Sequence, residues 1–126
     1  MSDTRRLTQE FFDAIDRNGI AGIAPFLADD FIWWSAGMGE IQAELLNIGE
    51  ILTPHIDGKM QMKVHNMLVE GNKSAVEVES FAKLTNGRTY NNHYHFKLSF
   101  DGDKVKEVRE YNDTKHADEA LKGILT

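Results

Sequence analysis

Hydrophobic residues recur at helical spacing in the N-terminal part of the chain. The first such segment, residues 3–18, has an apolar stripe of Leu7, Phe11 and Ile15. A short second segment carries Ile23, Phe26 and Leu27. A third carries Ile41, Leu45, Ile48 and Leu52. With a short strand expected at residues 29–37, the pattern predicts three amphipathic helices and one early strand.

From Lys59 onward the period of the pattern changes to two. Strands are predicted at residues 59–70, 73–85, 88–100 and 104–112, joined by short connections that contain Gly, Asn or Asp. A closing helix is expected at 114–125, with Asp113 or Thr114 as its N-cap. Helices followed by a run of strands predict one α+β domain over residues 1–126, with an antiparallel meander as its sheet.

The lengths of the turns decide which side chains share a face of this sheet. If Gly71-Asn72 and Asn86-Gly87 are two-residue loops, Glu79 lies opposite Val64 on one neighbouring strand and opposite Tyr94 on the other. One face then carries Met62, Val64, Asn66, Glu77, Glu79, Phe81, Asn92, Tyr94 and Phe96. The other carries Lys63, His65, Val76, Val78, Ser80, His93, His95 and Lys97. Because the first face offers more aromatic area for the helices to cover, we predict that it points inward.

Composition and charge narrow the classes of function. The chain has no cysteine, which excludes disulfides and thiol chemistry. Twenty acidic and fourteen basic residues give a net charge of −6 without a basic stripe, so nucleic acid is not an expected partner. No apolar run approaches the roughly 18 residues of a membrane span, and no signal-type segment opens the sequence. We therefore expect a cytoplasmic protein that does not interact with membranes.

The order of elements and three segments resemble a known superfamily. The segments are LADDFIWW, NGRTYNNHYHF and REYNDT, and the chain resembles the nuclear transport factor 2-like superfamily over nearly its whole length. The resemblance is to the ketosteroid isomerase and SnoaL-like polyketide cyclase branch. It implies a cystatin-like fold, in which a cone-shaped, curved antiparallel sheet is covered by three N-terminal helices around a pocket. Such proteins are often dimeric through the outer face of the sheet.

The same resemblance suggests site residues. Compared with limonene epoxide hydrolases, the two catalytic acids fall on Glu79 and Glu110, which we predict to be catalytic. The catalytic tyrosine and aspartate positions of ketosteroid isomerases hold Phe11 and Ser35. The arginine of the epoxide hydrolases is replaced by Glu77. Ligand-binding residues are expected to be Phe11, Trp33, Ser35, Glu77, Phe81, Asn92 and Tyr94.

If three glutamates share one partly dry pocket without a cation, like-charge repulsion and desolvation should raise the pKa of at least one of them. We expect Glu110 to be the charged base and Glu79 its protonated partner. Trp33 and Trp34 are adjacent on a strand, so one should line the pocket and the other should pack outside it.

These features favour a small-molecule enzyme with an apolar pocket. It would use carboxylate acid/base proton transfer on a hydrophobic substrate, as an isomerase, cyclase or hydrolase, and would need no cofactor. The alternative is a non-catalytic ligand-binding or dimeric accessory domain of the same fold. In either case we expect a homodimer through the outer sheet face, which would cover His65, Val78, His93 and His95.

A metal site is the remaining alternative. Gly87, His93 and His95 match half of a cupin metal motif, in which a glutamate follows shortly. The first glutamate after His95 is Glu107, and cupins do not begin with three amphipathic helices. Because no third ligand converges on these histidines, no metal site is predicted.

Overall fold

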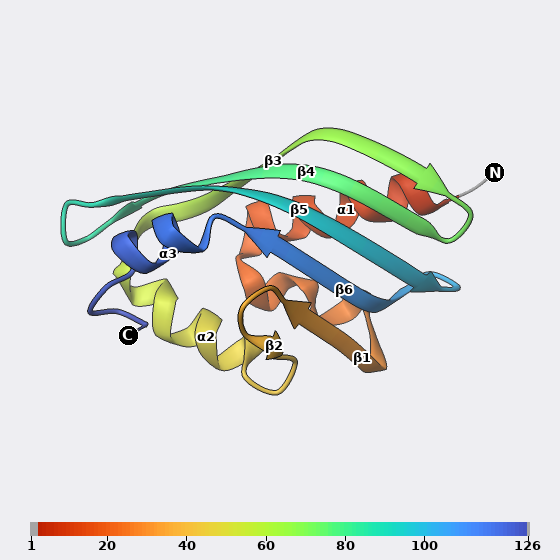
Figure 1. Ribbon diagram of the computed structural model, residues 1–126, viewed down its shortest axis with the longest axis horizontal. Helices are drawn as coiled ribbons and strands as arrows, with labels where there is room; N and C mark the ends of the chain where they lie inside the picture. The colour runs from red at the N-terminus through yellow and green to blue at the C-terminus, as the bar shows by residue number, and fades with distance from the viewer. Residues whose placement is uncertain (1–2, 126) are drawn as a thin grey trace.

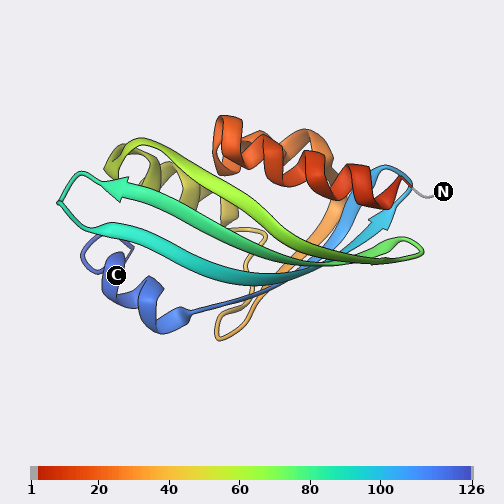
Figure 2. The same ribbon diagram turned by 90° about the horizontal axis from the view of Figure 1, so that it is seen from above.

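The computed structural model describes residues 3–125 and shows helices packed against a curved, six-stranded sheet (Figures 1 and 2). The helical elements are α1 (Thr4–Asn18), η1 (Ile20–Phe26), α2 (Leu45–Leu52), η2 (Thr53–His55) and α3 (Thr114–Ala120). The strands are β1 (Leu27–Ser35), β2 (Gly39–Glu40), β3 (Ile56–Glu70), β4 (Lys73–Leu84), β5 (Thr89–Asp101) and β6 (Lys104–Asn112). The sheet order is β2-β1-β6-β5-β4-β3.

The predicted meander and the early strand are confirmed, and so is the α+β class. The backbone N–H of His116 donates to the carboxylate of Asp113 at 3.0 Å, so Asp113, one of the two predicted candidates, is the N-cap of α3. Three details differ from the prediction. The second helix is a 3-10 helix, the third begins at Leu45, and the last ends at Ala120.

The sheet is mixed and not purely antiparallel, because β1 pairs with β6 in parallel. All other neighbouring strands are antiparallel. The register of the parallel pair places Trp33 beside Val108 and Ser35 beside Glu110. This pairing joins segments from opposite ends of the chain, so the local periodicity of the sequence carried no information about it.

The loop between β4 and β5 has three residues, Thr85 to Gly87, and not two. The N–H of Leu84 donates to the carbonyl of Arg88 at 2.9 Å, and Gly87 has a φ of 89°. Three-residue hairpin loops commonly end in a residue in this left-handed region, where glycine has no steric cost. The resulting register pairs Glu79 with His93 and Val78 with Tyr94.

A shift of one residue in the register moves every side chain of a strand to the other face of the sheet. The predicted orientation of β4 is therefore wrong. Val76 and Val78 are buried in the core, whereas Glu77, Glu79 and Phe81 lie on the outer face. On β5 the prediction is confirmed, since Asn92, Tyr94 and Phe96 alternate inward with the other buried positions of that strand.

The β3–β4 hairpin begins in the predicted register and then departs from it. Asn66 pairs with Glu77 as expected, but the register shifts between Val64 and Asn66. Val64 consequently pairs with Val78, and Met62 pairs with Ser80. A β-bulge of this kind lets the strand keep Val64 and Met67 in contact with the core on both sides of the shift.

Aromatic side chains form the centre of the core between α1 and the sheet. The ring of Phe12 lies 5.0 Å from that of Phe96, and the rings of Phe11 and Trp33 are 6.2 Å apart. A second buried cluster covers the other end of the sheet and includes Leu52, Ala82, Leu84, Tyr90, Ala120 and Leu121. The segment after β6 thus closes the end of the sheet that α1 leaves open.

The outer face of the sheet is polar with a few exposed rings, among them Phe81 and Tyr111. Val78, which was expected in a dimer interface there, faces inward instead, so that part of the argument for a homodimer is wrong. The homodimer itself stays a prediction. Within residues 3–125, no helix is both long enough and apolar enough to cross a membrane.

The corrected face of β4 predicts opposite effects of substitution at neighbouring positions. Val76→Thr should lower the free energy of unfolding by about 1–3 kcal/mol, because it buries a hydroxyl in an apolar site. Glu77→Gln, one residue away on the outer face, should change it by less than about 0.5 kcal/mol. Urea unfolding followed by circular dichroism measures both. Equal effects at the two positions would contradict the observed register.

Candidate active site

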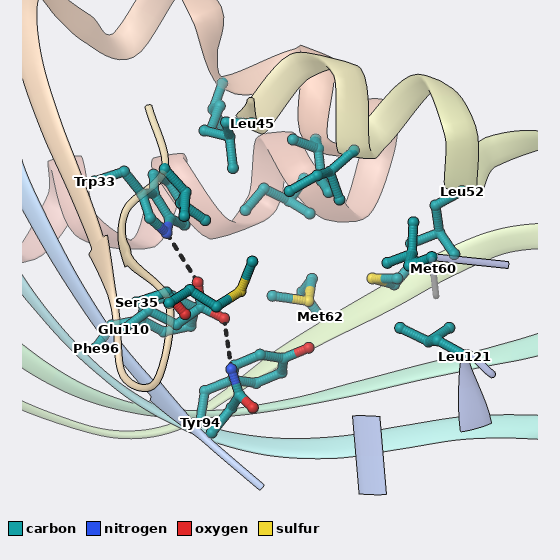
Figure 3. Close-up of a pocket in the computed structure, with 18 of the residues that line it drawn as sticks. Trp33, Ser35, Leu45, Leu52, Met60, Met62, Tyr94, Phe96, Glu110 and Leu121 are labelled. Atoms are coloured by element: carbon teal, nitrogen blue, oxygen red, sulfur yellow. Dashed lines mark hydrogen bonds between the residues drawn. The ribbon is translucent and has the colours of Figure 1, made fainter. Parts of the chain in front are cut away.

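A cavity of about 190 Å³ lies between the helices and the inner face of the sheet (Figure 3). Most of its wall is apolar, built by Ile15, Ile20, Ile23, Met38, Ile41, Leu45, Ile48, Leu52, Met60, Met62, Phe96, Leu121 and Leu125. The remaining lining residues carry polar groups: Trp33, Ser35, Tyr90, Tyr94, Glu110 and Asn112. A wall of this composition suits a hydrophobic molecule with one or two polar atoms.

Glu110 is held in the cavity by two hydrogen bonds from neighbouring positions on the sheet. The indole Nε1–H of Trp33 donates to Oε1 at 2.8 Å, and Nδ2 of Asn112 donates to Oε2 at 2.9 Å (Figure 3). Trp33 reaches Glu110 because β1 and β6 are paired, and Asn112 reaches it because residues two apart on a strand point to the same face. The two donors orient both carboxylate oxygens.

Burial raises the pKa of Glu110 above the ordinary value of a glutamate. The hydrogen bonds from Trp33 and Asn112 favour the charged form and offset part of that effect. No Lys, Arg or His side chain is among the described residues that line the cavity. Without a cation to favour the charged form, Glu110 can take up a proton at a higher pH than an exposed glutamate does.

Asn112 can accommodate either protonation state of Glu110. Its Oδ1 is buried and is the one buried side-chain N or O atom without a hydrogen-bond partner among the described residues. Rotation of the amide by about 180° about χ2 exchanges Oδ1 with Nδ2. The rotated amide accepts a hydrogen bond from a protonated Glu110, whereas the present orientation donates to the carboxylate. The pair therefore keeps a hydrogen bond before and after proton transfer.

A second polar group lies on β5. The hydroxyls of Tyr90 and Tyr94 are 2.6 Å apart, and Nδ2 of Asn92 donates to Tyr90 at 2.9 Å. Burial raises the pKa of both tyrosines, and that of Tyr94 is raised well above its ordinary value. Both side chains are therefore neutral near pH 7 and act as hydrogen-bonding groups, not as charges.

The structure brings only part of the predicted site to the cavity. Trp33, Ser35, Tyr94 and Glu110 line it. Phe11 packs behind Trp33 in the core, so it supports the wall without forming it. Asn92 is fully buried behind the wall, where its side chain bonds to Tyr90 and to the backbone of Asp113.

Glu77, Glu79 and Phe81 are outside the cavity, on the opposite face of the sheet, because of the register of β4. Glu79 accepts one hydrogen bond from Nδ2 of Asn91 at 2.9 Å and interacts with Nε2 of His65 at 2.8 Å. The bond from Asn91 first, and then that from His65, lowers the pKa of Glu79. The expectation of three glutamates in one pocket, with Glu79 protonated, is therefore wrong.

The two tryptophans diverge as predicted. Trp33 is buried and lines the cavity, whereas Trp34 packs outside against Tyr111, with the Arg109 guanidinium 3.9 Å from the centre of its ring. Sequence reasoning missed Tyr90 and Asn112. Strand spacing could have identified both, since Tyr90 lies four residues from Tyr94 and Asn112 lies two residues from Glu110.

The sequence and the fold both relate the chain to known proteins. A family model described as SnoaL-like domain matches residues 8–108. The chain belongs to this family. None of the curated proteins compared with this SnoaL-like sequence matches it significantly.

Three solved structures illustrate the similarity of the fold. AclR from Streptomyces galilaeus has 18% identity and a TM-score of 0.82, with 98% of each chain covered. BvnE pinacolase from Penicillium brevicompactum has 15% identity and a TM-score of 0.80, with 94% of this chain and 91% of that one covered. An epoxide hydrolase from M. tuberculosis has 15% identity and a TM-score of 0.74, with 98% and 90% covered. At these identities the comparison shows a shared fold.

The environment of Glu110 predicts a titration that Trp33 can report. Because the Trp33 indole N–H donates to the carboxylate, its NMR resonance should move as Glu110 takes up a proton, with a midpoint above the ordinary glutamate pKa. The indole N–H of Trp34 serves as the internal reference. Glu110→Gln should abolish the movement. A midpoint at the ordinary value would contradict the effect of burial.

The raised pKa of Glu110 also predicts how stability depends on pH. Between the unfolded and folded pKa values the folded state binds more protons than the unfolded state, so the free energy of unfolding falls as pH rises through this window. Glu110→Gln removes this loss. At a pH above the folded pKa of Glu110 the variant should be more stable than the wild type, and at a pH below the unfolded pKa the difference should vanish. Thermal unfolding across pH tests the sign.

Proposed function

We propose that this SnoaL-like domain is a small-molecule enzyme in which Glu110 transfers a proton on a hydrophobic substrate held in the apolar cavity. The observation that supports this most directly is the position of Glu110. It is the one carboxylate among the described lining residues, it has no cation beside it, and Trp33 and Asn112 orient both of its oxygens. Acid/base catalysis is most efficient when the catalytic pKa lies near the working pH, and burial moves the pKa of Glu110 in that direction.

The reaction that fits this site is a proton transfer beside a carbonyl group. The Glu110 carboxylate removes a proton from the carbon next to the carbonyl, the electron pair of the C–H bond moves toward the carbonyl oxygen, and an enol or enolate results. Glu110, now protonated, returns the proton to the same or another atom of the substrate. The enzyme ends in its starting state, and isomerisation and cyclisation both proceed through this step.

Similar proteins and the position of Glu79 bear on the type of activity. Two proteins of similar fold are named as enzymes, a pinacolase and an epoxide hydrolase. Their names support an enzyme over a non-catalytic accessory domain. The limonene epoxide hydrolase pattern needs a second acid in the pocket, however, and Glu79 lies on the outer face. We therefore place the proton transfer on Glu110 alone.

Deuterium exchange into a hydrophobic ketone tests this proposal without knowledge of the natural substrate. In D₂O the protein should accelerate the exchange of the protons next to the carbonyl of 1-indanone for deuterium. Proton NMR measures the rate at which their signal is lost. Glu110→Gln should reduce the protein-dependent rate by at least about 100-fold, since general base catalysis contributes 10²–10⁴-fold. The exchange rate should rise with pH, and the midpoint of the rise should equal the pKa of Glu110 that the Trp33 resonance reports.

Glu79→Gln is the matched control, because it makes the same chemical change on the other face of the sheet. Its exchange rate should equal that of the wild type. Exchange no faster than in buffer, or equal rates for the wild type and Glu110→Gln, would remove the enzyme proposal. A ligand-binding accessory domain would then be the better description.

A further inference from the structure

Three hydroxyl groups lie close together on the inner face of β4 and β5. Ser80, Tyr90 and Tyr94 together carry three hydroxyl hydrogens. Two hydrogen bonds join them, one of 3.2 Å between Ser80 and Tyr94 and one of 2.6 Å between Tyr90 and Tyr94. Ser80 also acts on the pKa of Tyr90, but no hydrogen bond joins these two residues in the structure. Each hydrogen bond uses one hydrogen. One hydroxyl hydrogen therefore forms no hydrogen bond with a described residue.

The direction of the hydrogen bonds shows which residues can hold the remaining hydrogen. Ser80 Oγ donates to the oxygen of Tyr94, and Nδ2 of Asn92 donates to the oxygen of Tyr90. If Tyr90 donates to Tyr94, both lone pairs of Tyr94 are occupied and its own hydrogen is free. If Tyr94 donates to Tyr90, both lone pairs of Tyr90 are occupied and the hydrogen of Tyr90 is free. In either arrangement the free O–H belongs to a residue that lines the cavity.

We propose that the Tyr90–Tyr94 pair is a hydrogen-bond donor site of the cavity and that it binds the carbonyl oxygen of a hydrophobic ligand. Figure 3 shows Tyr94 extending from the sheet toward the space beside Met62, with Glu110 at the same end of the cavity. Apolar side chains pack in the same cluster as the pair, among them Met60, Leu121 and Leu125. No described acceptor forms a hydrogen bond with the free hydrogen in this structure, so a ligand oxygen can accept it.

The surroundings favour a neutral acceptor over an anion. No described lining residue is a cation, and the negative charge of Glu110 acts on both tyrosines. A carbonyl oxygen accepts without bringing a hydrogen of its own, so it satisfies the one free O–H and leaves no further donor buried. The ring of Tyr94 is stacked on Phe96 at 5.2 Å, and Asn92 anchors Tyr90, so the donor site is held in place before a ligand binds.

This inference rests on the proposed function for the claim that the cavity binds a hydrophobic small molecule, and it identifies that molecule as a ketone or another neutral carbonyl compound. Its test uses 1-indanone and indane, which share one ring system and differ in the carbonyl group. The measured quantity is the ratio of their affinities, obtained by ligand-observed NMR with the full chain.

Counting the hydrogens in each variant predicts a non-additive result. Tyr90→Phe leaves the hydrogen of Tyr94 free, and Tyr94→Phe leaves that of Tyr90 free, so each single variant should keep most of the preference for 1-indanone. The double variant Tyr90→Phe/Tyr94→Phe should lower the affinity ratio at least about tenfold, since no tyrosine donor remains. Tyr111→Phe, which removes an exposed hydroxyl from the outer face, is the matched control and should leave the ratio unchanged.

The infrared carbonyl stretch of bound 1-indanone gives a second readout, which does not require the double variant to fold. In the wild type the band should lie at lower frequency than in an apolar solvent. An unshifted band, an affinity ratio that is the same in all variants, or one single variant that equals the double would overturn the donor-pair proposal.

The remaining outcomes separate this proposal from the proposed function. If neither compound binds to the folded wild type, both are overturned. If the preference is present in Glu110→Gln and the wild type shows no deuterium exchange, the proton transfer is wrong and the donor site stands. If exchange occurs with no preference for 1-indanone, the reverse holds.

Discussion

The candidate site depends on the hydrogen bond from Trp33 to Glu110, which joins β1 to β6 at the cavity. A carboxylate in an apolar cavity is costly unless its oxygens have partners, and the Trp33 indole supplies one that carries no positive charge. That donor is available only because β1 runs parallel to β6 and brings Trp33 to the edge of the same cavity. Asn112 supplies the second donor from β6 itself. The acid is thus oriented by groups that leave its proton affinity high.

Glu79 and Glu110, the two predicted catalytic acids, differ in their surroundings and therefore in their proton affinity. Glu79 lies on the outer face among Asn91, His65 and His93, and its pKa is lowered, led by the bond from Asn91. Glu110 lies against aliphatic and aromatic side chains, and its pKa is raised by burial. Of the two, only Glu110 lines the apolar cavity, where the proposed proton transfer would take place.

The polar groups of the cavity are few, and each has a definite hydrogen-bonding capacity. Glu110 and Asn112 can exchange the roles of donor and acceptor as a proton moves, and one hydroxyl hydrogen of the Tyr90–Tyr94 pair forms no hydrogen bond with a described residue. Most of the remaining wall is apolar.

The sequence by itself determined the α+β class, the four strands of the meander, an N-cap at Asp113 or Thr114 and the divergence of Trp33 and Trp34, because periodicity and capping are local properties. The family resemblance added Glu110 and the fold. The face of β4 could not be derived in this way, since it depends on whether the loop after Leu84 has two residues or three, and Asn86-Gly87 suits both. The pairing of β1 with β6 and the hydroxyl chain of Ser80, Tyr90 and Tyr94 join positions from separate strands. Those contacts were decided by the tertiary structure. The free energy gained by burying Val76 and Val78, and by forming the hydrogen bonds to the Glu110 carboxylate, exists only once the strands and helices have packed together.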